Sequence, residues 1–325
     1  MSDQGDGPAN RSEETLRVRT AAEIEADLSP YDDDSTPLAR ALEAELQVRR
    51  HLSFKDPLPR PEHTRVLVVA NQKGGVGKTT TTVNLAAALA MHGLRVLVVD
   101  LDPQGNASTA LGAEHRRGTP SSYDVLVDGA AIKDVVQQHP DIPTLQVVPA
   151  TIDLAGAEIE LVSVVARESR LRKALAAHDL VGSGEDRLDY VFVDCPPSLG
   201  LLTLNALVAG AEMLIPIQAE YYALEGLGQL VETIEMVRAH LNQDLSISTI
   251  LITMYDGRTN LAAGVADEVR THFQDQVLKT AIPRSVRVSE APSYGQTVMT
   301  YDPGSPGALS YLEAARELAV RGVWA

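Results

Sequence analysis

The sequence contains a single cysteine, Cys195, in 325 residues. One cysteine excludes an intrachain disulfide and any metal site made only from the cysteines of one chain, and it suits a reducing compartment. The sequence has no apolar run of about 18 residues, and its N-terminus is polar and acidic, unlike a signal peptide. These absences predict a cytoplasmic protein without a membrane-spanning helix.

Aromatic residues are also scarce, at 4% of the chain, although 44% of the residues are apolar. The core must therefore consist of Val, Leu, Ile and Ala, which suits a buried parallel sheet covered by helices. The net charge of −16 disfavours a basic nucleic-acid-binding face. However, residues 1–62 hold 14 acidic and 8 basic side chains, so part of this acidity lies outside the main domain. The total charge does not decide whether a local basic patch exists.

The chain divides near residue 62. Residues 1–62 contain Asp32 to Asp34, scattered Pro and Ser, and no β-branched runs, which predicts a largely disordered acidic extension that ends in a proline-rich linker. Leu38, Leu42 and Leu46 fall on one stripe of a possible helix over residues 36–50. That helix could be solvated, or it could dock on a partner or on the domain. We expect residues 63–325 to form one domain.

From Arg65 onward, apolar strand patterns alternate with helical ones. We predict strands over residues 65–70, 95–99, 145–148, 189–194, 212–217, 247–254 and 277–282. Helical patterns cover residues 78–91, 157–178, 199–209, 223–241, 261–273 and 308–320. Strands separated by helices predict an α/β fold with a mostly parallel sheet and helices on both faces.

A glycine-rich loop follows the first strand. Its residues are Lys73, Gly74, Gly75, Val76, Gly77, Lys78, Thr79 and Thr80. Glycines let backbone N–H groups turn toward phosphate oxygens, and the following helix adds its positive end. Lys78 would contact the β- and γ-phosphates, and the Thr79 hydroxyl would coordinate Mg²⁺. Since strand, glycines, Lys-Thr and helix occur in this order, a phosphate site is favoured over a turn without a ligand.

This loop departs from the ordinary phosphate-binding pattern. The position of its usual first glycine holds Gln72, and an additional lysine, Lys73, opens the loop. Lys73 would crowd Lys78 if both bound the same phosphates. We therefore expect Lys73 to contact a nucleotide held by a partner subunit.

Acidic residues end two of the other predicted strands. Asp100 and Asp102 follow the second strand, and two-residue spacing lets both face one crevice at the carboxyl edge of the sheet. One carboxylate could orient water while the other supports the Mg²⁺ shell. Asp194 ends the strand Tyr190-Val-Phe-Val and has the pattern of a Walker B carboxylate, which holds Mg²⁺ through water. We expect Cys195 beside it to be a buried packing residue.

These segments together resemble the ParA/Soj family of chromosome- and plasmid-partitioning ATPases, which belong to the deviant Walker A (MinD/ParA-like) group of P-loop NTPases. The motifs are Lys73–Thr80, Asp100–Asn106 and Asp194–Ser198, followed by Pro216–Gly226, Thr253–Leu261 and Ile282–Pro292. The resemblance covers residues 65–320, and the acidic extension falls outside it.

The resemblance implies a cofactor, partners and residue roles. ATP and Mg²⁺ would bind at Lys73–Thr80, with Thr79, Asp102 and Asp194 around the metal ion and Asp102 needed for hydrolysis. Lys73 would cross the interface of an ATP sandwich homodimer. Met254 and Pro283 would line the adenine pocket, while Arg258 and Arg287 would contribute to non-specific DNA binding. A ParB-type centromere-binding partner would stimulate hydrolysis on the nucleoid.

Related proteins with other activities suggest alternatives. An iron–sulfur relative would need bridging cysteines, and a tyrosine kinase of this loop type would carry a tyrosine-rich tail. A MinD-like membrane switch would end in a basic amphipathic helix, whereas residues 309–325 carry two arginines and two glutamates. ATP-dependent ligation in cofactor synthesis shares the fold and stays open at this point, because one sequence does not reveal a small-molecule pocket.

Overall fold

The computed structural model describes residues 57–220 and 223–321. The predicted helix over residues 36–50 and nearly all of the acidic extension over residues 1–62 lie outside this part of the chain. The predicted features of these segments therefore stay predictions.

The described residues form a seven-stranded sheet with the strand order β3-β4-β2-β5-β1-β6-β7. The strands are β1 (Arg65–Val69), β2 (Val96–Asp100), β3 (Gln137–Gln138), β4 (Leu145–Val148), β5 (Tyr190–Asp194), β6 (Glu212–Gln218) and β7 (Ser246–Thr253). All neighbouring strands are parallel except β3, which pairs antiparallel with β4. Every residue of β2 and β5 is buried, because helices cover both faces of the sheet.

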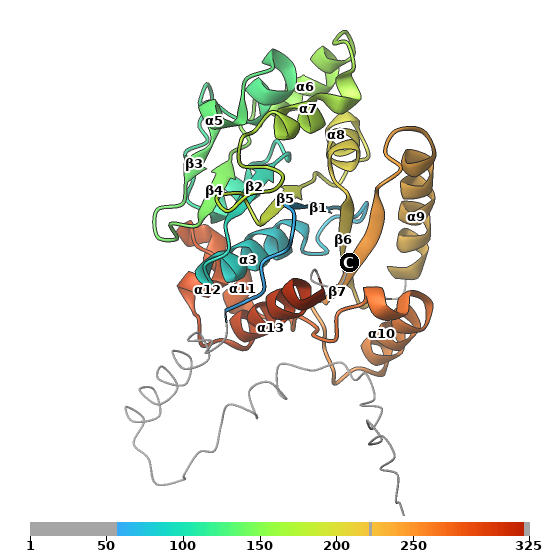
Figure 1. Cartoon of the computed structure of the whole chain (residues 1–325). Helices are drawn as coiled ribbons and strands as arrows, with labels where there is room; N and C mark the ends of the chain where they lie inside the picture. The colour runs from blue at the N-terminus through green and yellow to red at the C-terminus, as the bar shows by residue number, and fades with distance from the viewer. Residues whose placement is uncertain (1–56, 221–222, 322–325) are drawn as a thin grey trace, which may run out of the picture.

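Two hydrophobic clusters occupy opposite faces of the sheet. Val96 and Val98 belong to one cluster, whereas Leu97 and Val99 belong to the other, as the two-residue period of a strand requires. In Figure 1, α3 and α11 to α13 lie on one side of the sheet and α6 to α8 on the other. The helices are α3 (Lys78–Met91), α4 (Asn106–Ala110), α5 (Ile132–Val135), α6 (Leu154–Leu161), α7 (Arg170–Ala176), α8 (Leu201–Ala209), α9 (Ala223–His240), α10 (Asn260–Phe273), α11 (Val286–Glu290), α12 (Val298–Tyr301) and α13 (Pro306–Arg321). The predicted α/β fold class is confirmed.

The predicted strand over residues 277–282 is wrong. Isolated bridges join this part of the chain to β7 and to the residues that follow it. The N–H groups of Lys279 and Thr280 donate instead to the carboxylate of Glu317 in α13, at 2.7 and 2.9 Å. Because these donors bond a side chain, no continuous strand ladder forms.

The predicted single helix over residues 157–178 is also wrong. Helix α6 ends at Leu161, and a further helix, α7, begins at Arg170. Between them the backbone of Ala166 takes a left-handed conformation with φ of 53°. A left-handed residue cannot continue a right-handed helix, so the periodic pattern breaks here into two short helices.

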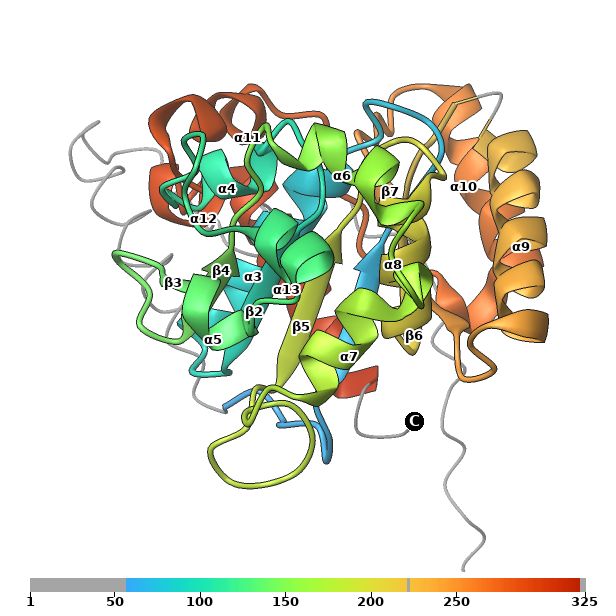
Figure 2. The same ribbon diagram turned by 90° about the horizontal axis from the view of Figure 1, so that it is seen from above.

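The parallel strands end at one edge of the sheet, which carries the segments singled out in the sequence. Figure 2 shows the loop between β1 and α3 at this edge, together with α4 and α6. In an open parallel sheet this carboxyl edge is where ligands bind. The fold therefore gathers the candidate residues on one side of the molecule.

Candidate functional site

The glycine-rich loop is open around Gly74 and Gly75. Gly75 and Gly77 have φ angles of 77° and 88°, a left-handed conformation that favours glycine. A Cβ atom built on Gly74 or Gly75 would meet no atom within 4 Å. Gly77 caps α3 without a side-chain acceptor, and the first turn of the helix has no acidic residue. The loop is therefore free to receive an anion at a helix N-terminus.

Lys78 lies in the first turn of α3 and is buried. Its ammonium group donates to the carbonyl oxygen of Lys73 at 3.3 Å, so the side chain folds back across the loop. Burial lowers the pKa of Lys78, while the nearby carboxylates of Asp194 and Asp102 act in the opposite direction. A charged group kept partly from water in this way would gain strongly from an anionic ligand.

Hydrogen bonds connect the glycine-rich loop and Asn71 before it to the neighbouring strands β6 and β7. The Thr253 hydroxyl at the end of β7 donates to the carbonyl oxygen of Val76 at 2.8 Å. The amide of Asn71 donates to the Pro216 carbonyl oxygen in β6 at 2.8 Å, and its own oxygen accepts the Lys73 N–H at 3.0 Å. Rigid strands therefore determine the shape of the loop.

The structure brings Asp194 directly against the first turns of α3. Its two oxygens accept from the hydroxyls of Thr79 at 2.7 Å and Thr82 at 2.9 Å. Burial raises the pKa of Asp194, and the neighbouring carboxylate of Asp100 raises it further. Thr82 was not predicted from the sequence, because its partner is 112 residues away and only its place in the run Thr79–Thr82 could have pointed to it.

Asp100 pairs in register with Asp194 but has a different set of donors. One oxygen accepts the N–H of Asp102 at 3.0 Å, and the other accepts both the N–H and the hydroxyl of Ser108 at 2.9 and 2.7 Å. The Ser108 hydroxyl oxygen also accepts the N–H of Ala150 at 2.9 Å. Asp100 therefore anchors the segment that follows β2, and its oxygens already have protein partners.

Asp102 lies on that anchored segment and retains acceptor capacity. One of its oxygens accepts the N–H of Gln104 at 3.0 Å, and its side chain is buried. The two-residue spacing predicted one crevice for Asp100 and Asp102. The two carboxylates differ in their bonding, because Asp100 anchors the segment whereas Asp102 keeps lone pairs for a further donor. That both face one crevice stays a prediction.

Cys195, which follows Asp194, is fully buried. Burial raises the pKa of its thiol, and the adjacent Asp194 raises it further. A thiol in such surroundings is a poor nucleophile. The expectation that Cys195 packs in the core is confirmed.

Met254 and Pro283 come together beside the phosphate loop. Met254 follows Thr253 with a left-handed φ of 49°. The next residue, Tyr255, forms a bridge with Pro283, and its N–H donates to the Ile282 carbonyl oxygen at 2.9 Å. The fold thus places both predicted adenine-pocket residues at one point of the edge, and their contact with adenine stays a prediction.

Arg258 and Arg287 are exposed, and each is paired with acids of its own chain. Arg258 bonds Asp256 at 2.9 Å, which lowers the pKa of that carboxyl to about 2. Arg287 lies 3.2 Å from Glu290 and 3.4 Å from Asp302. Arg284, which no sequence pattern singled out, is exposed as well, and its backbone N–H donates to the Tyr255 carbonyl oxygen.

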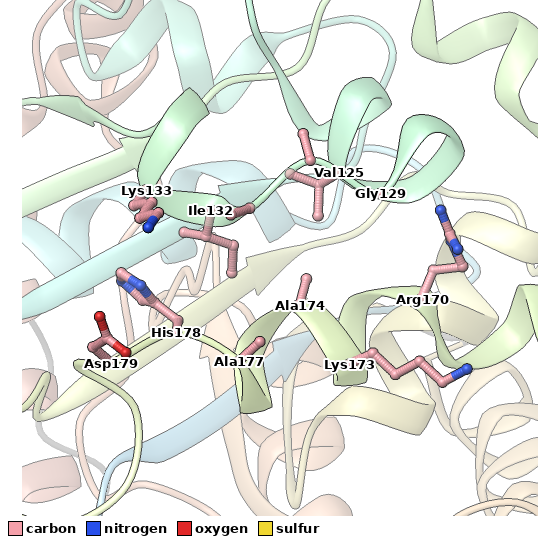
Figure 3. Close-up of a pocket in the computed structure, with 12 residues that line it drawn as sticks. Val125, Gly129, Ile132, Lys133, Arg170, Lys173, Ala174, Ala177, His178 and Asp179 are labelled. Carbon is pink, nitrogen blue, oxygen red and sulfur yellow. The ribbon is translucent and has the colours of Figure 1, made fainter.

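A separate cavity of about 290 Å³ lies between α5 and α7 (Figure 3). Lys133, Arg170 and Lys173 contribute to its lining. The Arg170 guanidinium donates to the carbonyl oxygens of Leu126 and Val127 at 2.8 and 3.0 Å. These bonds connect α7 to the helical turn over Asp124–Asp128. None of the predicted site residues lines this cavity.

The described residues contain no group of three or more His, Cys, Asp or Glu side chains arranged to hold a metal ion. A metal ion at Thr79 and Asp194 would therefore need most of its ligands from phosphate and water, which is how Mg²⁺ is commonly held in nucleotide sites. The same part of the chain has no helix that is long and apolar enough to cross a membrane.

Residues 64–247 match the protein family described as an AAA domain. The sporulation initiation inhibitor protein Soj of Bacillus subtilis is 53% identical over 258 residues, which cover 79% of this chain and 99% of that protein. The chromosome partitioning protein ParA of Myxococcus xanthus is 51% identical and covers 79% of this chain and 88% of its own length. Among solved structures, the chain is similar to a crystal structure from Mycobacterium smegmatis that is named cobyrinic acid a,c-diamide synthase and contains bound ADP and magnesium. The TM-score is 0.65 and the sequence identity 40%, and the match covers 78% of this chain and 92% of that chain.

Proposed function

Because this chain belongs to the ParA/Soj family of partitioning ATPases, we propose that it binds ATP with Mg²⁺ between β1 and α3 and hydrolyses it to ADP and phosphate to segregate DNA. The observation that carries this proposal is the meeting of Lys78, Thr79 and Asp194 at an open glycine loop, with Asp102 on the adjacent anchored segment. Residues 63–325 would form the ATPase domain, and residues 1–62 the acidic extension.

The residues present fit Mg·ATP. The N–H groups of Gly74 to Gly77 and the ammonium group of Lys78 would hold the phosphates, together with Thr80 at the start of α3. The Thr79 hydroxyl would coordinate the metal ion, and Asp194 and Asp102 would support it through water. When bound, Mg²⁺ would supply positive charge that neutralises the negative charge developing on the phosphates in phosphoryl transfer.

Asp102 would position the attacking water. Its oxygens keep free lone pairs, whereas those of Asp100 are taken up by Asp102 N–H and Ser108. A proton leaving the water could be accepted by Asp102 or passed to solvent. The role of Asp100 would be to hold Asp102 at a constant distance from the phosphate loop, since catalysis of this reaction depends mainly on positioning.

Dimer formation and DNA binding would also use residues at the carboxyl edge of the sheet. Lys73 would reach the nucleotide of the second subunit in an ATP sandwich dimer. The dimer would bind DNA non-specifically, with Arg258 and Arg287 as phosphate contacts, because guanidinium groups match phosphate oxygens. A ParB-type partner would stimulate hydrolysis, and hydrolysis would release the dimer from DNA. The protein would act in the cytoplasm, on the nucleoid. Met254 and Pro283 would contact adenine.

The packing of α13 argues against a MinD-like membrane switch that would use this helix. Leu309, Leu312 and Leu318 of α13 are buried in the core cluster that also contains α3. An amphipathic helix that inserts into a membrane must present its apolar face to lipid. Here that face belongs to the protein interior.

The name of the Mycobacterium smegmatis structure suggests a second candidate, the ATP-dependent formation of an amide. Glutamine-dependent amide formation requires a reactive thiolate, and the only cysteine of this chain is buried with a raised pKa. This observation favours partitioning. A test would supply ammonium and a carboxylic acid substrate with ATP, and coupling of amide formation to hydrolysis would support the second candidate.

The test of the proposed function is DNA binding measured with ATP, with ADP and without nucleotide, at several salt concentrations. We expect binding only with ATP, with little dependence on DNA sequence and a steep loss of affinity with salt, of slope about −0.9 per phosphate contact. Arg258→Glu and Arg287→Glu should lower the affinity and make the slope shallower while leaving ATP-dependent dimerisation intact.

Arg238→Glu on α9 is the matched control. Arg238 is exposed and pairs with Glu235 three residues earlier, much as Arg287 pairs with Glu290 three residues later. If the unmodified protein shows no ATP-dependent DNA binding at low salt, the partitioning function is refuted and only the dimeric ATPase stays as a proposal.

A further inference from the structure

Lys73 is held within its own subunit by three contacts. Its N–H donates to the Asn71 side-chain oxygen at 3.0 Å, and its carbonyl oxygen accepts from the Lys78 ammonium at 3.3 Å. Its own ammonium forms an ion pair with Glu220 at 2.6 Å. Lys73 therefore does not project freely from the edge of the sheet.

Glu220 lies two residues beyond the end of β6. Asn71 is bonded to the same strand through the Pro216 carbonyl oxygen at 2.8 Å. The two ends of the Lys73 residue, its backbone N–H and its ammonium, are thus both fastened to one strand and the turn that follows it. Both ends of Lys73 are therefore held by residues of its own subunit.

One of the three contacts would weaken when a nucleotide binds. A phosphate in the glycine loop would attract the Lys78 ammonium, because a charged oxygen is a far stronger acceptor than a peptide carbonyl. The hydrogen bond from Lys78 to the Lys73 carbonyl oxygen would then weaken. Of the three contacts, the ion pair with Glu220 is the one that retains the Lys73 side chain itself.

We infer that Glu220 is a positioning residue that holds Lys73 in its own subunit until ATP and a second subunit are present together. This inference rests on the proposed cross-subunit role of Lys73. The side chains of Lys73 and Glu220 are 40% and 46% exposed, so solvent screens the pair and it opens readily. Glu220 thereby opposes dimerisation weakly and sets the ATP and protein concentrations at which dimers form.

The first experiment compares Glu220→Gln with the unmodified protein by analytical ultracentrifugation, with a non-hydrolysable ATP analogue at saturation. One exposed ion pair shifts an equilibrium by up to about fivefold. Because each of two subunits must open one pair, the dissociation constant of the dimer should fall by about twofold to 25-fold. The affinity of the monomer for the analogue should not change.

Glu235→Gln is the matched control, since it removes the same charge from an exposed ion pair with Arg238 on α9. It should leave the dissociation constant unchanged. Unchanged or weaker dimerisation of Glu220→Gln would overturn the inference, and weaker dimerisation would place Glu220 in the dimer interface. An equal effect of Glu235→Gln would overturn it as well, because net charge would then be the cause.

A second measurement does not depend on the dimer. In the nucleotide-free protein, the rate at which an amine-reactive reagent acylates Lys73 is followed by mass spectrometry. Glu220→Gln should raise this rate, and Glu235→Gln should not; equal rates would overturn the inference. If Lys73 becomes more reactive but the unmodified protein never dimerises with the analogue, the positioning contact stands and the proposed sandwich dimer fails.

Discussion

Replacing Thr82 by valine tests the environment of Asp194 directly. The Thr82 side chain is fully buried in α3, and its single hydroxyl proton lies between Asp194 Oδ1 at 2.9 Å and the Lys78 carbonyl oxygen at 3.0 Å. Valine keeps the shape and removes the hydroxyl. Where Asp194 is ionised, this hydrogen bond to a charged group contributes about 1.5–3 kcal/mol to stability. For a domain of this size, the loss corresponds to a melting temperature lower by about 3–12 °C.

The size of this loss should depend on pH. Burial raises the pKa of Asp194, while the hydroxyls of Thr79 and Thr82 lower it. The folded protein therefore binds more protons than the unfolded chain from about pH 4, the ordinary carboxyl pKa, up to the raised pKa. Over this window the contribution of Asp194 to stability falls as pH rises. Thr82→Val raises the folded pKa further, so its deficit should be smallest at the acid end and grow with pH.

Thermal unfolding of the nucleotide-free protein at about pH 5, 7 and 9, values that span this window, measures the deficit. Thr82→Ser is the control, because it keeps the hydroxyl and loses only a buried methyl group, at a cost of about 1 kcal/mol that does not vary with pH. Titration with Mg·ATP should show that the valine variant needs a higher pH for equal affinity, since Mg²⁺ competes with the proton on Asp194. A pH-independent deficit in the valine variant would refute the assigned bonding.

Three further variants test other parts of the site and fold. Lys78→Ala should abolish ATP binding in isothermal titration, because the phosphates lose their main cationic partner; unchanged affinity would remove Lys78 from the site. Asp102→Ala should leave ATP binding intact but reduce turnover to a negligible rate, leaving a persistent dimer, and near-normal hydrolysis would point to another water-positioning group. Gly210→Ala should destabilise the fold by about 1–3 kcal/mol in urea titration, because its Cβ would collide with the Val68 side chain.

The sequence predicted most of the sheet and the segments that meet at its edge. Short apolar runs identified β1, β2 and β4 to β7, since strands buried on both faces carry continuous Val, Leu and Ile. It could not predict contacts such as Thr82 with Asp194 or Lys73 with Glu220, whose partners are 112 and 147 residues apart. Local periodicity has no information about such pairs.

The two wrong predictions have causes that the local sequence does not contain. Residues 157–178 carry an unbroken helical pattern, yet Ala166 turns left-handed, and Arg167 and Leu171 after it bond to the side chain of Asn205 in α8. The segment over residues 277–282 is apolar enough for a strand, but Glu317 of a distant helix takes two of its N–H donors. In both places tertiary contacts override the local preference.

The two edges of the sheet determine whether another copy of the protein could add a strand to it. One edge is β3, a strand of two residues. At the other, the N–H groups of Leu278 and Ile282 donate to the carbonyl oxygens of Ile250 and Ile252, at 2.9 and 2.8 Å, and cover β7. Within the described residues, neither edge presents a long row of unpaired peptide groups, the usual template for irreversible strand addition and aggregation. Contacts between copies of the protein would therefore be made by side chains rather than by the addition of strands.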